Sequence, residues 1–176
     1  MDNGARHGWP QIEPLPLADV LAWRNALDIG TQQVAKLPTV KALFSLLHIS
    51  RMDQTEPTAV LWLAQCLESL FSVPTALSFN YLTSRVPMLL GPPPDEKRFR
   101  RVLREFVGAR NAFAHGGADV THPLNHDGLD DPVLNAWERW MAPSDFASSI
   151  VIAALQRLVL NGWKSANWRE GIEPGA

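Results

Sequence analysis

The residues best suited to chemistry lie together in one short stretch of the chain, at Arg110, Asn111 and His115. An arginine side chain keeps its positive charge and can hold a phosphate group through two parallel hydrogen bonds. A histidine changes its charge near neutral pH, so it can act as a general acid or a general base. An asparagine beside them can position a phosphate oxygen or orient the histidine. This set of side chains suits a reaction at a phosphodiester.

The spacing of these residues leaves two interpretations open. On an ideal helix Asn111 and His115 share a face, whereas Arg110 and His115 lie about 140° apart. Arg110 and His115 could meet at one ligand if the last turn unwinds, which Gly116 and Gly117 would permit, or if two helices come together. Otherwise His115 is a solvated residue near the negative end of the helix dipole, and Arg110 belongs to a structural ion pair.

The helix expected to carry these residues begins after Pro94 and ends at the double glycine. Two acidic residues in its first turn suit the positive end of the helix dipole. At about 100° per residue, its apolar side chains fall on one face, which consists of Phe99, Val102, Leu103, Phe106, Ala109 and Phe113. Arg110 lies in the middle of this face. Because an unpaired buried charge costs several kcal/mol, Arg110 needs a partner in the folded protein.

The opposite face of the same helix is basic, since Lys97, Arg101 and Arg104 cluster there with Asn111 and His115. The whole chain of 176 residues has a formal net charge of −2. The molecule as a whole therefore does not attract nucleic acid, and any contact with RNA must be local. The basic face is the place where we expect it.

A second helix is expected to supply the partner of Arg110. Residues 57–72 are apolar around nearly the whole helical circumference, which predicts a central position in a bundle. The narrow polar edge of this helix is Gln65, Glu68 and Ser69. Glu68 would be largely desolvated there, so it is the candidate partner for Arg110 or Arg85. The alternative is a solvated glutamate on the surface.

Three segments together resemble HEPN domains, and the Apea-like HEPN domains in particular. Residues 62–71 form an apolar run around a glutamate, residues 82–91 contain an arginine, and Arg110 and His115 form an Arg-x4-His motif in which a polar residue follows the arginine. The order and the spacing of the segments also fit, over residues 56–165. Pro87 departs from the pattern, and we expect it to kink or end the middle helix.

The resemblance implies an all-α fold, a HEPN-like antiparallel helical bundle with additional N- and C-terminal helices. It implies a homodimer that brings two Arg-x4-His motifs into one cleft, and a metal-independent endoribonuclease without cofactors. Attack by the ribose 2′-OH would leave a 2′,3′-cyclic phosphate, and DNA would be inert. The implied catalytic residues are Arg110, His115 and Asn111, the supporting residues are Glu68 and Arg85, and the RNA-binding residues are Lys97, Arg101 and Arg104.

The acidic net charge favours a selective endonuclease over a processive RNA-binding protein. A toxin-like or defence effector, controlled by an antitoxin or another regulatory protein, fits this charge. The second hypothesis is a non-catalytic HEPN module in which Arg110 and Glu68 form a structural pair. In that case the dimer face or a surface at Trp137 and Trp140 binds a protein partner. An open cleft around Arg110 would favour the enzyme, and a sealed Arg110 would favour the module.

The remaining segments also predict helices, and no alternating run predicts a strand. The expected helices cover residues 17–36, 38–47, 74–90, 132–141 and 144–162, with Ser144 as an N-cap. The first of them is expected to place Val20, Leu21, Leu27 and Val34 in the core. We expect a flexible arm at residues 1–16, one domain at residues 17–165 and a flexible tail at residues 166–176.

Two further interpretations concern metals and the compartment. His122, His126 and Asp127 could suggest a metal site, but Pro123 and Gly128 argue against the helix that an H-x3-H spacing requires, so we predict none. The chain has one cysteine, which excludes an internal disulfide and predicts a reducing compartment, the cytoplasm. No apolar run approaches the length of a membrane span, and 46% hydrophobic with 19% charged residues is typical of a globular protein.

Overall fold

The structure is a computed structural model that describes residues 8–52, 57–74, 78–122 and 130–168. Within these ranges the chain forms helices and no strand, so the predicted all-α class is confirmed. The helices are α2 (Leu17–Ala26), α3 (Pro38–Ser50), α4 (Ala59–Leu70), α5 (Ser78–Leu90), α6 (Glu96–Ala114) and α7 (Asp131–Leu160). None of these helices is long and apolar enough to cross a membrane.

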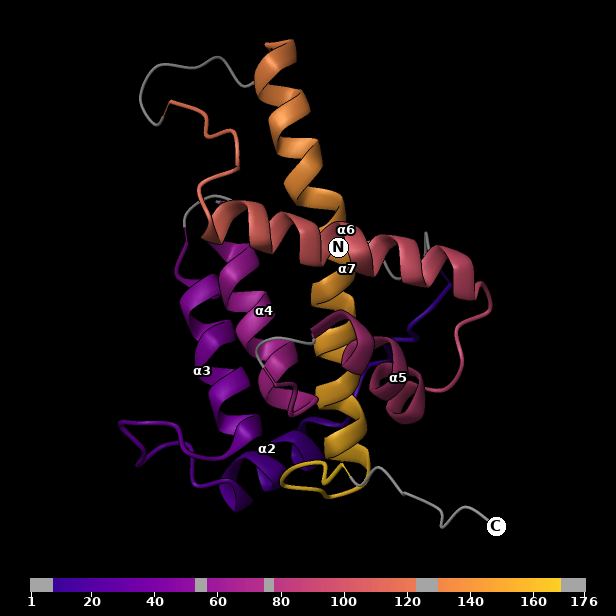
Figure 1. Ribbon diagram of the computed structural model, residues 1–176. Helices are drawn as coiled ribbons and strands as arrows, with labels where there is room; N and C mark the ends of the chain where they lie inside the picture. The colour runs from indigo at the N-terminus through magenta and orange to yellow at the C-terminus, as the bar shows by residue number, and fades with distance from the viewer. Residues whose placement is uncertain (1–7, 53–56, 75–77, 123–129, 169–176) are drawn as a thin grey trace.

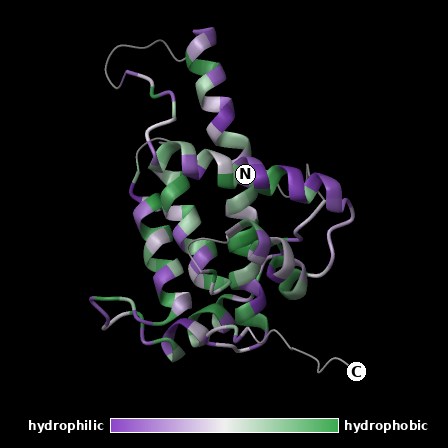
Figure 2. Ribbon diagram, in the orientation of Figure 1, coloured by the Kyte–Doolittle hydropathy of each residue, from purple (hydrophilic) through white to green (hydrophobic). Residues whose placement is uncertain are grey.

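Helix α4 lies at the centre of the bundle, as its sequence predicts. It packs against α3, α6 and α7, and seven of its twelve residues are buried. In Figure 1, α6 lies across one end of α3 and α4, and α2 lies at the opposite end. Figure 2 shows that the first turns of α6 are strongly hydrophilic, whereas α4 is mostly hydrophobic. The arrangement therefore puts a charged helix across the end of an apolar bundle.

Helix α6 begins and ends where local signals predict. The Asp95 carboxylate accepts a hydrogen bond from the Arg98 backbone N–H at 2.9 Å, which caps the N-terminus. At the other end Gly116 has a φ of 74°, a left-handed conformation that glycine adopts without strain. The Gly117 N–H then donates to the Ala112 carbonyl at 2.8 Å. His115 is thus the last residue before the chain turns away from α6.

The C-terminal end of α4 is closed by a Schellman motif that contains no glycine. Ser72 has a φ of 47°, and the Val73 N–H donates to the Glu68 carbonyl at 2.9 Å. Arg85 of α5 donates to the Phe71 and Ser72 carbonyls at 2.6 and 2.8 Å. Trp168 donates to the Leu70 carbonyl at 3.1 Å through its indole N–H. The carbonyls at the end of α4 that have no backbone partner therefore accept hydrogen bonds from side chains.

The first helix is shorter than predicted. Helix α2 ends at Ala26 and not at Lys36, because the chain turns at Asp28, whose φ is 53°. Leu27 is buried as expected, but Leu21 and Val34 are 45% and 72% exposed, so the predicted stripe of core residues is wrong at both positions. Gln32 donates to the Leu27 carbonyl at 2.9 Å, so a side chain completes the helix end locally.

The two helices predicted at residues 132–141 and 144–162 are one helix, α7, which continues through Pro143. A proline inside a helix removes one backbone hydrogen bond, and packing here offsets that loss. Pro143 and Ser144 are themselves buried, so Ser144 is not an N-cap. Trp140 is 8% exposed and packs edge-on against Phe113 of α6, with ring centroids 6.0 Å apart. The N-terminal half of α7 extends beyond the bundle (Figure 1).

Pro87 lies inside α5, which continues to Leu90 as predicted, so the proline does not end the helix. One other expectation needs correction. Trp9 belongs to the segment expected to be a loose arm, yet it is 8% exposed and packs edge-on against Phe99 at 5.3 Å. At the other end Trp168 packs against Phe71 at 5.5 Å. The packed domain therefore extends on both sides beyond the predicted residues 17–165.

Candidate functional site

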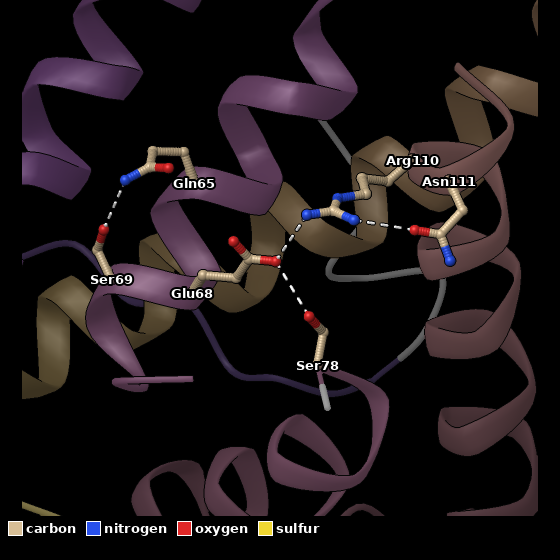
Figure 3. A network of polar contacts seen from close by, with 6 residues as sticks. All are labelled: Gln65, Glu68, Ser69, Ser78, Arg110 and Asn111. Atoms are coloured by element: carbon tan, nitrogen blue, oxygen red, sulfur yellow. Dashed lines mark hydrogen bonds and ion pairs between the residues drawn. The ribbon is translucent and has the colours of Figure 1, made fainter. Parts of the chain in front are cut away.

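An ion pair joins the two central helices of the candidate site. The Nη2 atom of Arg110 on α6 lies 3.3 Å from the Oε1 atom of Glu68 on α4 (Figure 3). The two side chains are 24% and 16% exposed. The partner that the sequence predicts for Arg110 is thus present. The pair lies at the edge of the core, where water still reaches part of the guanidinium.

Two more side chains complete the network shown in Figure 3. Ser78, the first residue of α5, donates through its hydroxyl to the same Glu68 oxygen at 3.0 Å. The Nη1 atom of Arg110 donates to the Asn111 side-chain oxygen at 3.0 Å. Sequence reasoning missed Ser78, and only its position at the start of a helix could have drawn attention to it. The network therefore gathers residues from three helices around one guanidinium.

The network holds Arg110 and also leaves it able to bind an anion. A guanidinium has five N–H donors, and the two hydrogen bonds to Glu68 and Asn111 use two of them. The cavity beside the ion pair, lined by Leu67, Ser78 and Phe106 among others, has a volume of about 10 Å³. This is the space of roughly one water molecule. An anion would therefore approach Arg110 from the exposed side and not from a pocket within one chain.

His115 does not join this network. Its side chain is exposed at the C-terminal end of α6, and within the described ranges it forms no hydrogen bond or ion pair. Asn111 is exposed one turn before it. The structure thus brings together Arg110, Asn111 and Glu68, and it leaves His115 apart on the surface. A single chain does not assemble all three of the predicted catalytic residues.

Arg85 has a structural position rather than one beside Arg110. Its side chain is 7% exposed and donates to the carbonyls of Phe71 and Ser72. Its guanidinium also lies over the rings of Tyr81 and Trp168, at 4.5 and 5.6 Å from their centroids. A cation at this place stabilises the negative end of the α4 dipole. Arg85 supports the site only indirectly, because it fixes the end of the helix that carries Glu68.

The predicted RNA-binding residues Lys97, Arg101 and Arg104 are all exposed on α6. Arg101 faces Glu105, with 4.0 Å between Nε and Oε1. The Arg104 guanidinium lies 5.0 Å from the centroid of the Phe79 ring of α5, and Arg100 lies 5.9 Å from the same ring. The sequence analysis did not single out Arg100 or Phe79. The four-residue spacing of Arg100 and Arg104 was the available signal.

The remaining reactive groups lie elsewhere. Cys66 is fully buried and its thiol donates to the Ala42 carbonyl at 3.3 Å. Burial raises the pKa of the Cys66 thiol to about 12, so it is not a nucleophile. No three potential metal ligands come together in the described part of the chain. His126 and Asp127, considered above as metal ligands, lie outside the described residues.

Comparisons of the chain with models of protein families, with curated proteins and with solved structures find no match in any of the three.

Proposed function

We propose that the protein is a metal-independent HEPN-type endoribonuclease whose site is completed by a second copy of the chain. The observation that carries this proposal is the Arg110 guanidinium, held by Glu68 and Asn111 with part of its surface open. An exposed histidine follows on the same helix. The resemblance of the three helical segments to HEPN domains supports the same function.

Each side chain has a distinct role in the proposed reaction. Arg110 binds the nonbridging oxygens of the scissile phosphate and stabilises the charge that develops on them. His115 takes the proton of the attacking 2′-OH or gives a proton to the leaving 5′ oxygen. Glu68 fixes the orientation of Arg110, and Asn111 offers its amide N–H groups to a phosphate oxygen. The P–O bond to the 5′ oxygen breaks as the 2′ oxygen bonds to phosphorus, which yields a 2′,3′-cyclic phosphate.

A second copy supplies what one chain does not assemble. In the described part of one chain the His115 side chain forms no hydrogen bond or ion pair, and the cavity beside the Arg110–Glu68 pair is too small for a nucleotide. Two α6 helices that meet near their C-terminal ends would place the His115 side chain of one copy opposite Arg110 of the other. This arrangement would also cover the exposed part of the Arg110–Glu68 pair, whose side chains are 24% and 16% exposed.

The second candidate function is a non-catalytic interaction module. The observation that favours it is the carboxylate itself, because Glu68 already neutralises Arg110 and the cavity beside the pair has a volume of only about 10 Å³. In this case the ion pair contributes to the fold alone. The two functions differ in what the loss of His115 would do.

The test is cleavage of a mixed RNA pool by the purified protein in the presence of a chelator. We expect cleavage, with cyclic phosphate ends and with no cleavage of 2′-deoxy substrates. His115→Ala should lower the rate by about 10²–10⁴. The control is His48→Ala, which removes an exposed histidine of α3 that stacks on the Trp62 ring at 4.1 Å, so thermal melts of both variants accompany the assay. Arg110→Lys keeps a cation beside Glu68 but loses the two-pronged contact with phosphate, so it should cleave slowly while remaining folded.

The decisive comparison is between His115→Ala and His48→Ala. A folded His115→Ala protein that cleaves RNA at the wild-type rate would exclude the catalytic function and leave the interaction module. Loss of cleavage in His115→Ala alone, with the thermal stability of the wild-type protein, would establish the enzyme.

A further inference from the structure

We infer that the RNA strand lies along one stripe of α6, formed by Arg100, Arg104, Asn111 and His115, beside the Phe79 ring of α5. This inference rests on the proposed function and names the path by which the substrate reaches its site. It differs from the sequence expectation, because it adds Arg100 and Phe79 and gives Arg101 no part.

The four residues of the stripe follow one side of the helix. At about 100° per residue their side chains lie within roughly 60° of one another. From Arg100 to His115 the stripe extends over roughly 22 Å at 1.5 Å per residue. The buried residues Phe99, Leu103 and Phe106 point to the core instead. The stripe is therefore a long polar surface, with Arg100 and Arg104 at one end and the proposed reacting residue His115 at the other.

The two cations of the stripe are oriented by an aromatic ring. Arg100 and Arg104 both lie over Phe79, at 5.9 and 5.0 Å from its centroid. A guanidinium on an aromatic face keeps its in-plane N–H groups available for phosphate oxygens. In the described part of the chain no carboxylate lies within 4.0 Å of Arg104.

Two other arginines of α6 are less available than Arg104. Arg100 contacts Glu96 at 3.3 Å, but these side chains are 46% and 71% exposed, so the pair is weak and a phosphate can replace it. Arg101 faces Glu105 on a different side of the helix. These differences point to Arg104 as the main phosphate contact of the stripe.

The first turn of α5 connects the stripe with the Arg110 network. Ser78 donates to Glu68, and the next residue, Phe79, contacts Arg104. Two neighbouring residues thus fix the ion pair and the stripe relative to each other. In addition, Asn111 belongs to the stripe and accepts a hydrogen bond from Arg110. A strand bound along the stripe would therefore pass directly beside the guanidinium.

The ligand that fits the stripe is single-stranded RNA. Two of its phosphates can contact Arg100 and Arg104, which lie one helical turn apart, and its exposed bases can stack on aromatic rings and guanidinium planes. The stripe also ends at the histidine that the proposed reaction needs next to a 2′-OH.

The experiment measures binding without cleavage. A fluorescent oligonucleotide with 2′-O-methyl groups at every position is titrated with protein, and its anisotropy is followed at several salt concentrations. Arg104→Gln should weaken binding roughly tenfold, since it removes one charge-assisted contact. It should also lower the slope of log Kd against log salt by about 0.7. The matched control is Arg24→Gln, which removes an exposed arginine from α2 at the opposite end of the bundle (Figure 1).

The outcomes separate this inference from the proposed function. If Arg104→Gln and Arg24→Gln bind equally well, or if the wild-type protein does not bind the oligonucleotide, the stripe is not the RNA path. Loss of cleavage in His115→Ala would in that case still support the enzyme. The 2′-O-methyl oligonucleotide cannot be cleaved, so the binding result stands whatever the cleavage assay gives. Weaker and less salt-dependent binding of Arg104→Gln alone supports the stripe.

Discussion

Arg110 is at once part of the packing between helices and the proposed ligand of a phosphate. Its pair with Glu68 is only partly covered, with 24% of the arginine side chain exposed. At this depth a charge needs a partner, yet an incoming anion can still reach it. A phosphate would share the guanidinium with Glu68 and would not have to displace the carboxylate, because the N–H donors on its other edge remain available.

The cost of removing Glu68 tests how much the fold depends on this network. Glu68→Gln leaves Arg110 without a counter-charge and should lower the free energy of unfolding by about 1–3 kcal/mol. Glu96→Gln removes the carboxylate of the exposed pair with Arg100, and it should change the free energy of unfolding by less than about 0.5 kcal/mol. Urea unfolding of both variants checks the difference. Equal losses would mean that the Arg110–Glu68 pair is no more than a surface contact.

Ser72 offers a second test at the scale of single residues. Its φ of 47° is unfavourable for a side chain with a Cβ atom, whereas glycine adopts it freely. Ser72→Gly should therefore raise the free energy of unfolding by about 0.5–1 kcal/mol. Ser69→Gly, inside α4, should lower it by roughly 0.5 kcal/mol. Thermal melts that show destabilisation by both glycines would contradict the Schellman ending of α4.

At the scale of elements, the orientation of α6 decides which of its residues face the core. Phe106 is 2% exposed, so Phe106→Ala should leave a cavity and cost about 3–5 kcal/mol. Lys97 is exposed on the other side, and Lys97→Ala should change stability by under about 0.5 kcal/mol. Urea melts of the two variants measure this contrast. Comparable losses would show that the helix is rotated relative to the bundle.

The sequence predicts those elements whose ends depend on local signals. Asp95 and the glycines after His115 define α6, because a cap and a left-handed turn act within a few residues. Pro143 is a local signal that does not end a helix. Helix α7 continues through this proline, because buried neighbours offset the hydrogen bond that the proline cannot form. The sequence also contains no strong signal for the end of α2 at Ala26, before the turn at Asp28.

The candidate site also has parts that the sequence predicts and parts that it does not. The Glu68–Arg110 pair is predictable, because a charge on each of two apolar helices needs a partner. The parts played by Ser78 and Phe79 are not, since they depend on where the first turn of α5 lies in relation to α4 and α6. Arg85 shows the same limit, because the sequence analysis names it as a possible partner of Glu68 but does not reveal that backbone carbonyls bind it.

At the scale of the whole molecule, the proposed function requires two chains. We expect light scattering at micromolar concentration to give twice the mass of one chain. The physical reason is that the His115 side chain does not join the Arg110 network in the described part of one chain, and a second copy would supply it. A strict monomer under these conditions, together with RNA cleavage, would show that one chain reorganises the end of α6. A strict monomer without cleavage would leave the composite site without support.

The closed end of α4 has a consequence for the entropy of ligand binding. Helix ends usually fray, and a residue in the last turn samples many backbone conformations. Glu68 lies in that turn, yet its own carbonyl is bound by Val73 and the carbonyls that follow are bound by Arg85 and Trp168. The freedom of this segment is therefore lost when the chain folds and not when a ligand arrives. The backbone that carries the Glu68 carboxylate is thus already held by these hydrogen bonds before any phosphate binds.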